Sequence, residues 1–234
     1  MSDEVNRAQP VDFNEFAGNY DAALDRGISL SGEDKDFFAR GRVEWLRSCI
    51  QDSRPQRVLD YGCGTGSASP LLHRVLGARA VVGVDTSVES IAVAKRSAAS
   101  GISFSSIDEY RPAADIDVAY CNGVFHHIPL AERAGAIQYV RDSLRPAGLF
   151  SFWENNPWNP GTRLVMSRIP FDRDAILVSA LEARRLLRAG GFEILGTHFL
   201  FVFPKMLSAL RALERSLTRL PLGAQYQVLC RKLP

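Results

Sequence analysis

Short apolar runs alternate with amphipathic stretches through the middle of the chain. The spacing predicts buried strands at 57–61, 79–85, 102–106, 116–122 and 149–154. Between them, apolar residues recur at helical spacing at 67–76, 88–99 and 129–144. Alternation at this pitch predicts parallel strands joined by right-handed crossovers, so the expected fold class is α/β.

Both ends of the chain depart from this alternation. Two amphipathic helices are predicted first, at 13–24 and 31–50, the second with Ser31 as its N-cap. After the middle region the pattern predicts a helix at 181–189, a strand at 192–203, a helix at 204–220 and a last strand at 224–232. We expect the last two strands to be neighbours and to include an antiparallel partner.

Helix boundaries have their own signals. Thr86 with Glu89 and Ser179 with Glu182 have the spacing of capping boxes, which predicts the starts of the helices at 88–99 and 181–189. Gly190 and Gly191 are expected to terminate the second of these helices, because glycine accepts the left-handed conformation that often follows a helix.

Composition narrows the classes of protein. The 234 residues are 46 % hydrophobic and 23 % charged, which allows a single domain with a sizeable core. The net charge of +2 comes from scattered Lys and Arg, so no nucleic-acid partner is expected. No signal peptide and no transmembrane segment is expected, because the N-terminus lacks an apolar core region and no apolar run approaches 18 residues.

Four cysteines, Cys49, Cys63, Cys121 and Cys230, show no CxxC pair and no Cys/His spacing that is typical of a metal site. We therefore expect no metal. Cysteine usage of this kind favours a reducing cytoplasm.

A glycine-rich loop follows the first predicted strand, in the stretch "VLDYGCGTGSASP" at 58–70. Gly62, Gly64 and Gly66 allow positive φ and let a ligand approach main-chain N–H groups. The helix after the loop adds unpaired donors at its N-terminus. The pattern favours a nucleotide-like ligand, although an isolated loop of this kind is as often only a tight turn.

Neighbouring residues narrow the ligand. Ser67 occupies the third position of a dinucleotide GxGxxG, and no Lys-Ser/Thr pair follows the loop, so neither an NAD fingerprint nor a P-loop fits well. Asp60 would repel a pyrophosphate and attract a cationic amino group. Asp85 ends the second strand, where a carboxylate can accept two ribose hydroxyls. A ligand with a ribose, no phosphate and a cationic amino-acid end is S-adenosylmethionine (SAM).

At these positions the sequence resembles the class I SAM-dependent methyltransferases. "VLDYGCGTG", "VVGVDTS" and "ISFSSIDEY" resemble their first three motifs, "DVAYCNGVFHHIP" their fourth-strand motif, and "LRPAGLFSFWE" the turn before their fifth strand. The resemblance is strong over residues 55–155 and loose elsewhere. It implies a Rossmann-like seven-stranded sheet of order 3-2-1-4-5-7-6 with strand 7 antiparallel and helices on both faces. A helical lid at 1–54 would precede a methyltransferase domain at 55–234.

The resemblance also implies which residues hold SAM. Asp60 and the backbone of Gly62, Gly64 and Gly66 would hold the methionine part. Asp85 would bind the ribose, with Thr86 beside it. Ile107 and Asp108 would contact the adenine.

Two further parts of the chain would complete the cofactor site. After the fourth strand, the resemblance assigns cofactor-lining positions to Asn122, Gly123 and Val124. Tyr20 resembles aromatic residues that cover the cofactor from an N-terminal lid, and its alternative is a stripe residue that faces the core.

Two histidines are candidates for chemistry. His126 and His127 follow the fourth strand, where the acceptor enters in the resembled family. Imidazole titrates near neutral pH and could deprotonate an acceptor hydroxyl. His127 is the preferred base. The alternative for either residue is a histidine that orients the loop by hydrogen bonding.

The stretch "WENNPWNPGTR" at 153–163 predicts an acceptor-side loop. It differs from the NPPY signature of amine-directed DNA methyltransferases, which belongs after strand four, where this chain reads "CNGV". Glu154, Asn155 and Asn156 are candidate acceptor contacts. The alternative for the asparagines is turn formation.

The predicted helix at 204–220 places a row of leucines on one side and a row of arginines, Arg211, Arg215 and Arg219, on another. We interpret it as a helix that covers the core with a solvated basic face. The alternative is a peripheral contact with a membrane or with an acidic, lipid-linked acceptor.

These observations favour a methyltransferase that acts on an oxygen, nitrogen or carbon of a small-molecule metabolite or natural product. Two other classes remain. A SAM-binding protein without turnover would show the same binding motifs. An oxidoreductase that uses a dinucleotide is opposed by Asp60 and by the missing third fingerprint glycine.

Overall fold

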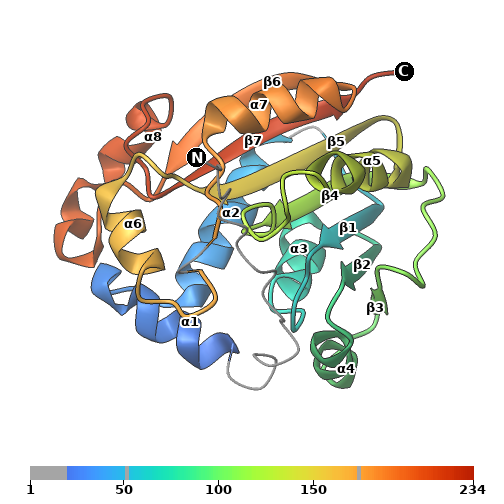
Figure 1. Ribbon diagram of the computed structural model, residues 1–234, viewed down its shortest axis with the longest axis horizontal. Helices are drawn as coiled ribbons and strands as arrows, with labels where there is room; N and C mark the ends of the chain where they lie inside the picture. Colours follow the sequence, from blue (N-terminus) through green and yellow to red (C-terminus); the bar gives the residue numbers. More distant parts are fainter. Residues whose placement is uncertain (1–19, 51–52, 173–174) are drawn as a thin grey trace, which may run out of the picture.

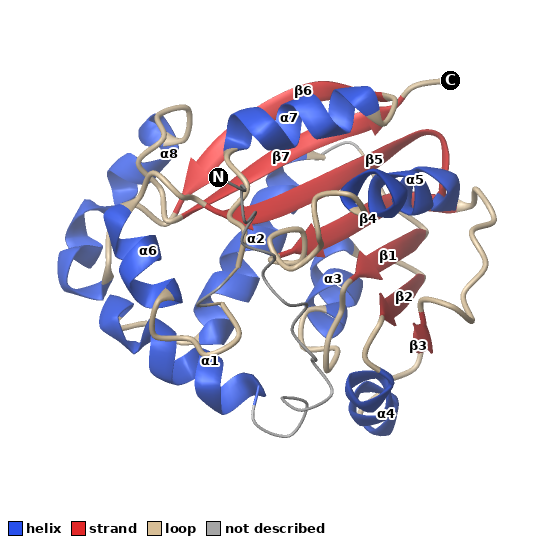
Figure 2. Cartoon of the chain, in the orientation of Figure 1, coloured by secondary structure: helices blue, strands red, loops and turns tan. Residues whose placement is uncertain are grey.

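The computed structural model describes residues 20–50, 53–172 and 175–234. Its centre is a seven-stranded sheet of order β3-β2-β1-β4-β5-β7-β6 (Figures 1 and 2). The strands are β1 (Arg57–Tyr61), β2 (Ala80–Asp85), β3 (Ile102–Ser106), β4 (Ile116–Asn122), β5 (Leu144–Asn155), β6 (Phe192–Leu200) and β7 (Gln225–Lys232). Strand β7 runs antiparallel to β5 and β6, and the other neighbours are parallel. The predicted order and the antiparallel seventh strand are confirmed.

Helices cover both faces of the sheet. One core cluster contains buried residues of α2 (Lys35–Cys49), α3 (Ser69–Leu76) and α4 (Val88–Arg96). The other contains buried residues of α5 (Arg133–Ser143) and α7 (Ala180–Ala189). Because Val43 and Leu46 of α2 are fully buried in the first cluster, α2 is a layer helix of the core, although it falls within the predicted lid.

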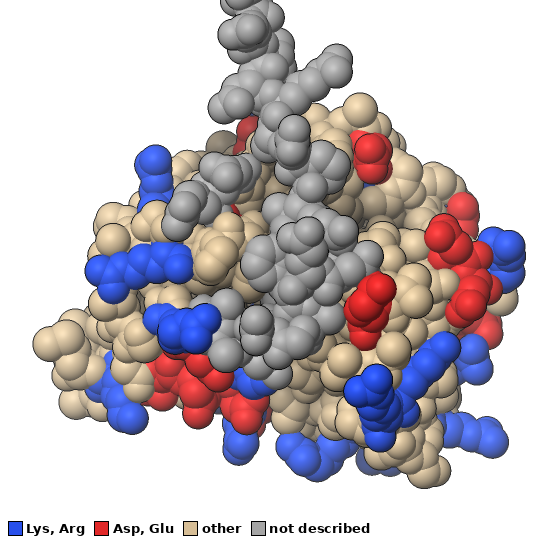
Figure 3. Space-filling model, turned by 60° about the horizontal axis from the view of Figure 1, so that its bottom comes forward, with Lys and Arg blue, Asp and Glu red and all other residues tan. Residues whose placement is uncertain are grey.

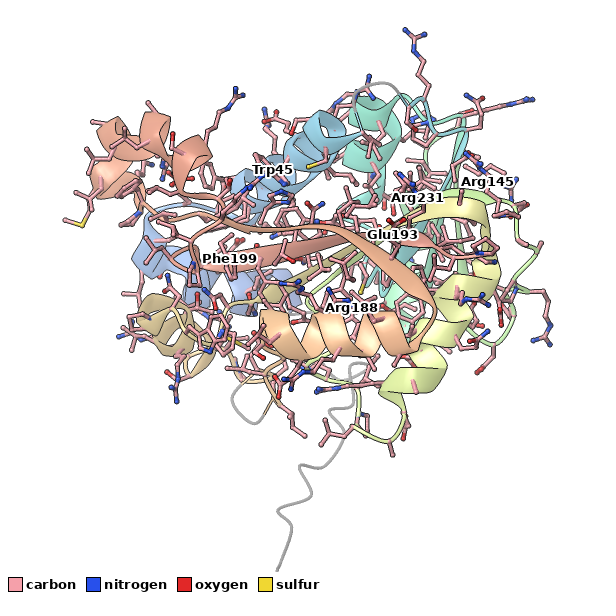
Figure 4. All side chains as sticks on the ribbon, turned by 90° about the horizontal axis from the view of Figure 1, so that it is seen from above. Trp45, Arg145, Arg188, Glu193, Phe199 and Arg231 are labelled. Atoms are coloured by element: carbon pink, nitrogen blue, oxygen red, sulfur yellow. The ribbon has the colours of Figure 1, made fainter. Side chains whose placement is uncertain are left out.

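The alternation of side chains extends the two layers to the edge of the sheet. Figure 4 shows Trp45 of α2 on one side of β6 and β7, and Phe199 with Arg188 of α7 on the other. The Trp45 ring lies 5.2 Å from that of His198, the residue before Phe199, as period-two alternation requires. Glu193 and Arg231 face each other across β6 and β7, with their charged atoms 3.8 Å apart.

Shorter elements gather beyond the carboxyl ends of β1, β4 and β5, as Figure 1 shows. They include α1 (Tyr20–Ile28), a 3₁₀ turn η1 (Ser29–Ser31) and α6 (Pro160–Met166). Helix α1 contacts both α2 and α6. A Cβ at Gly27 would overlap the Ile169 side chain, so glycine permits the close approach of α1 to the segment after α6. These elements position the walls of the site described below.

Two predicted N-cap residues are wrong. The N-cap of α2 is Asp34, whose carboxylate accepts from Phe37 N at 2.8 Å, whereas the Ser31 hydroxyl donates to Ile28 O within η1. The N-cap of α4 is Ser87 instead of Thr86. The helix itself begins at Val88, as predicted, and the Ser87 hydroxyl oxygen accepts from Ser90 N, while Ser87 N donates to the Asp85 carboxylate.

The predicted start and end of α7 (Ala180–Ala189) are confirmed. The capping box of Ser179 and Glu182 is confirmed, with both of its hydrogen bonds present. Gly191, at φ +81°, follows the helix in the left-handed conformation, as expected of a terminating glycine.

The predicted helix at 204–220 is replaced by a 3₁₀ segment η2 (Lys205–Leu213), interrupted at Leu207, and by the short helix α8 (Glu214–Leu217). Leu207, Leu210 and Leu213 recur every third residue, which matches three residues per 3₁₀ turn. They are 43 %, 42 % and 55 % exposed, so the interpretation as a core-covering helix is wrong. The peripheral contact stays a prediction. Among the described residues, no helix has the length and apolar run needed to cross a bilayer.

Candidate active site

The three glycines after β1 have positive φ, +71° at Gly62, +52° at Gly64 and +82° at Gly66, which explains why glycine is needed at each. Their surroundings differ. A Cβ at Gly62 would overlap Val124, and one at Gly66 would lie 2.6 Å from Phe104. Among the described residues, no atom lies within 4 Å of the place that a Cβ at Gly64 would take. Gly64 is therefore the member of the loop whose backbone faces open space, where a ligand can approach.

Asp60 lies in β1, two residues before Gly62, and is 2 % exposed. The Ser69 hydroxyl at the start of α3 donates to its Oδ2 at 2.7 Å. Burial raises the pKa of Asp60 to about 6; the Ser69 hydrogen bond and the charge of Arg42 oppose this rise and that of Asp85 adds to it. A cation placed beside this carboxylate would therefore be favoured strongly.

Asp85 ties the end of β2 to the glycine loop. Its Oδ2 accepts from Gly64 N at 2.8 Å, and its Oδ1 accepts from Ser87 N at 2.9 Å. Burial raises its pKa, and these backbone bonds oppose the rise. Because a carboxylate has about four lone-pair sites, Asp85 retains acceptor capacity for hydroxyl groups. Its own carbonyl accepts from Ile107 N, whereas Asp108 is exposed.

The end of β4 lies against the glycine loop. Val124 is the side chain that a Cβ at Gly62 would overlap, so the two segments are in direct contact. Gly123 has φ +67°, and the Oδ1 atom of Asn122 is buried without a hydrogen-bond partner among the described residues. A buried acceptor of this kind calls for a donor from a bound molecule.

A hydrogen-bonded cluster follows, made of His126, His127, Glu154 and Asp172. His126 Nδ1 lies 2.5 Å from Glu154 Oε2, and Glu154 Oε1 accepts from Phe125 N at 2.7 Å. Asp172 Oδ1 lies 3.1 Å from His127 Nε2 and 3.5 Å from His126 Nε2. Glu154, predicted to contact the acceptor, is instead 1 % exposed and lies behind His126.

The two rings differ in charge. Burial alone would lower the pKa of His126, but Glu154 and Asp172 outweigh it and raise that pKa to about 10. Burial lowers the pKa of His127, and Asp172 only partly opposes this. Despite its own burial, Asp172 has its pKa lowered to about 2 by the two histidines. At neutral pH His126 is an imidazolium, His127 is neutral and Asp172 is ionised.

Sequence reasoning missed Asp172. It lies 45 positions after His127, in a loop without a recognisable motif, and only the fold brings the two together. Donor atoms of His126, His127 and Asp172 lie within 4.8 Å of one another, an arrangement that could also hold a metal ion. The spacing of residues in the sequence does not indicate this grouping.

A cavity of about 510 Å³ opens in front of this cluster. Five of the predicted site residues line it: Asn122, Gly123, His126, His127 and Asn155. Asn156 does not line the cavity, because its amide donates to Pro221 O and Gly223 O and accepts from Trp158 N. The turn-forming alternative therefore describes Asn156. Tyr20 begins α1, but its side chain lies outside the described part of the chain, so its role stays a prediction.

Charged groups around the molecule are mixed in sign. On the face that Figure 3 shows, acidic and basic side chains are interspersed over the surface that is drawn in colour. Neither sign forms a continuous field on that coloured surface.

Comparison with known proteins agrees with this geometry. A family model described as a methyltransferase domain matches residues 58–148, the stretch from β1 into β5 that contains the glycine loop, Asp85 and both histidines. Residues 58–148 are therefore similar to a methyltransferase domain. The open space at Gly64 and the unpartnered Asn122 Oδ1, among the described residues, offer room and an acceptor atom for a bound cofactor at this place.

Proteins similar to this chain include a trans-aconitate 2-methyltransferase of Rhodopseudomonas palustris (strain BisB5). It is 34 % identical over 140 residues, which are 58 % of this chain and 54 % of that protein. A trans-aconitate 2-methyltransferase of Escherichia coli O1:K1 / APEC is 26 % identical over 119 residues, 50 % of this chain and 46 % of that protein. The chain thus spans about half the length of the curated relatives it matches.

Solved structures share the fold. A SAM-dependent methyltransferase from Archaeoglobus fulgidus aligns with a TM-score of 0.65 at 16 % identity, over 88 % of this chain and 97 % of that one. One from Mesorhizobium loti aligns with a TM-score of 0.59 at 21 % identity, over 81 % and 98 %. At these identities the likeness concerns the fold.

Proposed function

We propose that this methyltransferase transfers the methyl group of SAM to a hydroxyl oxygen of a small molecule held in the cavity. The observation that carries the proposal is the contact between the glycine loop and the end of β4. The loop would hold the cofactor on one side of that contact. Asn122, Gly123, His126 and His127 line the acceptor cavity on the other.

Four parts of the chain would hold SAM. Asp60 would face the ammonium group, because its buried carboxylate gains most from a cation. Asp85 would accept the ribose hydroxyls while it keeps the loop in place. Ile107 and Asp108, beside the end of β3, would contact the adenine, and Tyr20 would cover the site from α1.

When bound, SAM supplies a methyl group on a sulfonium sulfur and leaves as S-adenosylhomocysteine (SAH). His127 accepts the proton that the acceptor hydroxyl loses, because it is the neutral ring of the pair at neutral pH. Asp172 orients the His127 ring through Nε2. His126, held as an imidazolium between Glu154 and Asp172, fixes the position of Asp172 and cannot itself accept a proton.

The first test is calorimetric titration of the chain with SAH. Asp85→Ala removes the carboxylate that would accept two ribose hydroxyls, and the sugar donors lose their partners. We expect a loss of roughly 1.5–3 kcal/mol of binding free energy, which is about 10- to 100-fold in Kd. Asp142→Ala, which removes an exposed carboxylate from α5, is the matched control and should bind as the parent does.

Thermal unfolding of both variants without ligand separates ligand contact from damage to the loop, since Asp85 also holds Gly64 N. Unchanged SAH affinity in a folded Asp85→Ala variant would contradict the assignment. Transfer of labelled methyl from SAM to a hydroxyl acceptor then tests turnover, and SAH binding without transfer to any acceptor would support a binding protein instead.

A further inference from the structure

We infer that the acceptor is a largely apolar, uncharged molecule with one hydroxyl at its polar end, and that a polycarboxylate is not the substrate. The inference rests on the proposed function and adds the class of acceptor. It is carried by the walls of the cavity.

Most of the cavity wall is apolar. Side chains of α1, α2, the α6 region and the segment after β6 face it, among them Leu24, Phe38, Ile169, Phe171 and Phe201. Ile169 and Phe171 are each 2 % exposed, so this part of the wall is shielded from bulk water. A volume of about 510 Å³ has room for a ligand of drug-like size. A small hydrophilic acid would leave water trapped against apolar side chains.

The cations on the described part of the wall are already engaged. Arg42 donates from Nε to the Tyr120 hydroxyl at 3.0 Å and from a terminal nitrogen to Gln225 Oε1 at 2.8 Å. Arg42 is 8 % exposed, so a change of partner would leave these buried polar groups unpaired.

The guanidinium group of Arg211 also contacts groups within the chain. It pairs with Glu33 at 2.9 Å, donates to Phe203 O at 3.2 Å, and lies 4.6 Å from the centre of the Phe37 ring. Lys35 also has a partner within the chain. Binding of several carboxylates normally uses arginines whose donors are available to the ligand. Arg42 and Arg211 each already give two donor nitrogens to groups of the chain, which leaves each of them less able to grip a carboxylate with a two-donor fork.

The polar end of the cavity opposes anions. Asp172 lies on the wall there, with its Oδ1 3.1 Å from His127 Nε2, and Glu154 stands behind His126. Two carboxyl groups therefore lie at or just behind this end of the cavity. A carboxylate brought to this end would be repelled and would lose its hydration. A neutral hydroxyl donates to His127 without that cost.

The relatives do not decide the acceptor. The family match covers residues 58–148, which hold the cofactor loop and the two histidines. The apolar walls come from residues 24–42, 155–172 and 201–211, outside that match. Trans-aconitate, named for the relatives, carries three carboxylates, and the charges on these walls do not suit it.

The test measures binding to the chain saturated with SAH by calorimetry, with three probes. 4-Hexylphenol has an apolar tail and one hydroxyl. 4-Hydroxybenzoate keeps the phenol but replaces the tail by a carboxylate, and trans-aconitate is a tricarboxylate. We expect 4-hexylphenol to bind at least about tenfold more tightly than 4-hydroxybenzoate, and trans-aconitate to bind most weakly.

A matched pair of variants locates the site. Leu164 lines the cavity and is 51 % exposed, whereas Leu181 on α7 does not line it and is 52 % exposed. Leu164→Glu should weaken 4-hexylphenol by about fivefold or more, with SAH affinity kept. Leu181→Glu should change neither.

Each failure has a separate meaning. If trans-aconitate binds more tightly than 4-hexylphenol, or if the two phenols bind equally, the acceptor class is overturned. If Leu164→Glu and Leu181→Glu behave alike while both remain folded, the cavity is not the site. If the parent chain fails to bind SAH at all, the proposed function itself fails, and the acceptor class falls with it.

Discussion

His126 and His127 are neighbours in the sequence but lie in different electrostatic surroundings. Two carboxylates flank His126, one at each ring nitrogen, and they overcome the cost of burying a charge. His127 contacts Asp172 as well, but there burial prevails and its pKa falls below the ordinary 6.5. Adjacent residues of one type thereby acquire separate tasks, with a fixed cation at one position and a neutral ring at the other.

Removal of the neutral ring should slow turnover. On a hydroxyl acceptor that the parent chain methylates, we expect His127→Ala to lower the rate by about 10²–10⁴-fold, the usual range for loss of a general base. SAH affinity, measured by calorimetry, should change little. A His127→Ala variant with nearly full activity would leave the ring with the loop-orienting role.

Asp172→Asn tests the positioning role. The Asp172 carboxylate raises the pKa of His127 against burial, so its neutralisation should lower that pKa further. The loss of activity that accompanies protonation of His127 should then begin at a lower pH than in the parent chain. If Asp172 had only a structural role, Asp172→Asn would lower the rate at every pH without changing the pH at which activity falls on the acid side of the pH–rate profile. The cluster could also hold a metal ion, so a chelator-treated sample of the parent chain is the control. If chelation abolishes activity, the role of His127 as general base is contradicted.

At the scale of elements, the glycine loop combines packing with access. Gly62 and Gly66 are needed because Val124 and Phe104 leave no room for a Cβ, whereas Gly64 faces open space. Gly77, after α3, matches Gly64 in two respects: its φ is +67°, and no atom of the described residues lies within 4 Å of its Cβ position. It lies outside the loop, so it isolates the effect of backbone strain.

We expect Gly64→Val to abolish measurable SAH binding, because the new side chain enters the space where the ligand meets the backbone. Both Gly64→Val and Gly77→Val should lose stability by roughly 1–2 kcal/mol for a side chain in the left-handed region. Only Gly64→Val should lose affinity in calorimetry. If both variants bind SAH normally, the loop is a turn and no more.

Elements with strong periodicity could be predicted from the sequence, and the reason is physical. Strands buried on both faces read as continuous apolar runs, so β1, β2 and β4 were found within a residue or so of their bounds. The prediction of an α-helix at 204–220 is wrong because leucines at every third residue suit a 3₁₀ segment as well as one side of an α-helix. Hydrogen bonds from Phe203 N to Glu214 and from Arg211 to Glu33 then favoured the irregular form.

The residues of the candidate site likewise divide into those that sequence motifs predict and those that they do not. Asp60, Asp85 and the glycines belong to motifs at the ends of adjacent strands, and sequence spacing alone brings them together. Asp172 belongs to no motif and reaches His127 only through the path of the chain after α6. Glu154 and Asn155 are adjacent on β5, where alternation points their side chains to opposite faces, and only Asn155 lines the cavity.

At the scale of the whole molecule, the carboxyl ends of β1, β2 and β4 lie where two parts of the site meet. The glycine loop and Asp85, proposed to hold the cofactor, lie within the family match, and the apolar walls of the cavity lie outside it. One buried charge, Asp60, connects this architecture to stability. Its pKa rises from an ordinary 3.8 to about 6 in the folded chain. The folded state therefore holds a proton that the unfolded state has lost between about pH 4 and pH 6.

This bound proton decides the direction in which stability changes with pH. Stability falls as pH rises through this window, and the full cost of ionising Asp60, about 3 kcal/mol at about 1.4 kcal/mol for each pKa unit, is present above about pH 6. Asp60→Asn, which never ionises, should therefore be more stable than the parent at pH 8 and should lose most of that advantage near pH 4. Urea unfolding at the two pH values measures the difference, and an equal gain at both would contradict a buried, ionised Asp60.

Cofactor binding should show the opposite dependence, because the ammonium group of SAH needs the ionised carboxylate. At about pH 5 a group with a pKa near 6 is only about one-tenth ionised. We expect SAH affinity to rise by about tenfold from pH 5 to pH 7 and to level off above, with release of close to one proton near pH 5. Calorimetry in buffers of different ionisation enthalpy counts that proton. Asp85 is also a buried acid, so the Asp60→Asn variant decides which carboxylate releases the proton. This variant should bind SAH weakly, and its affinity should not change between pH 5 and pH 7. If the pH dependence of SAH affinity survives in Asp60→Asn, the proton belongs to Asp85.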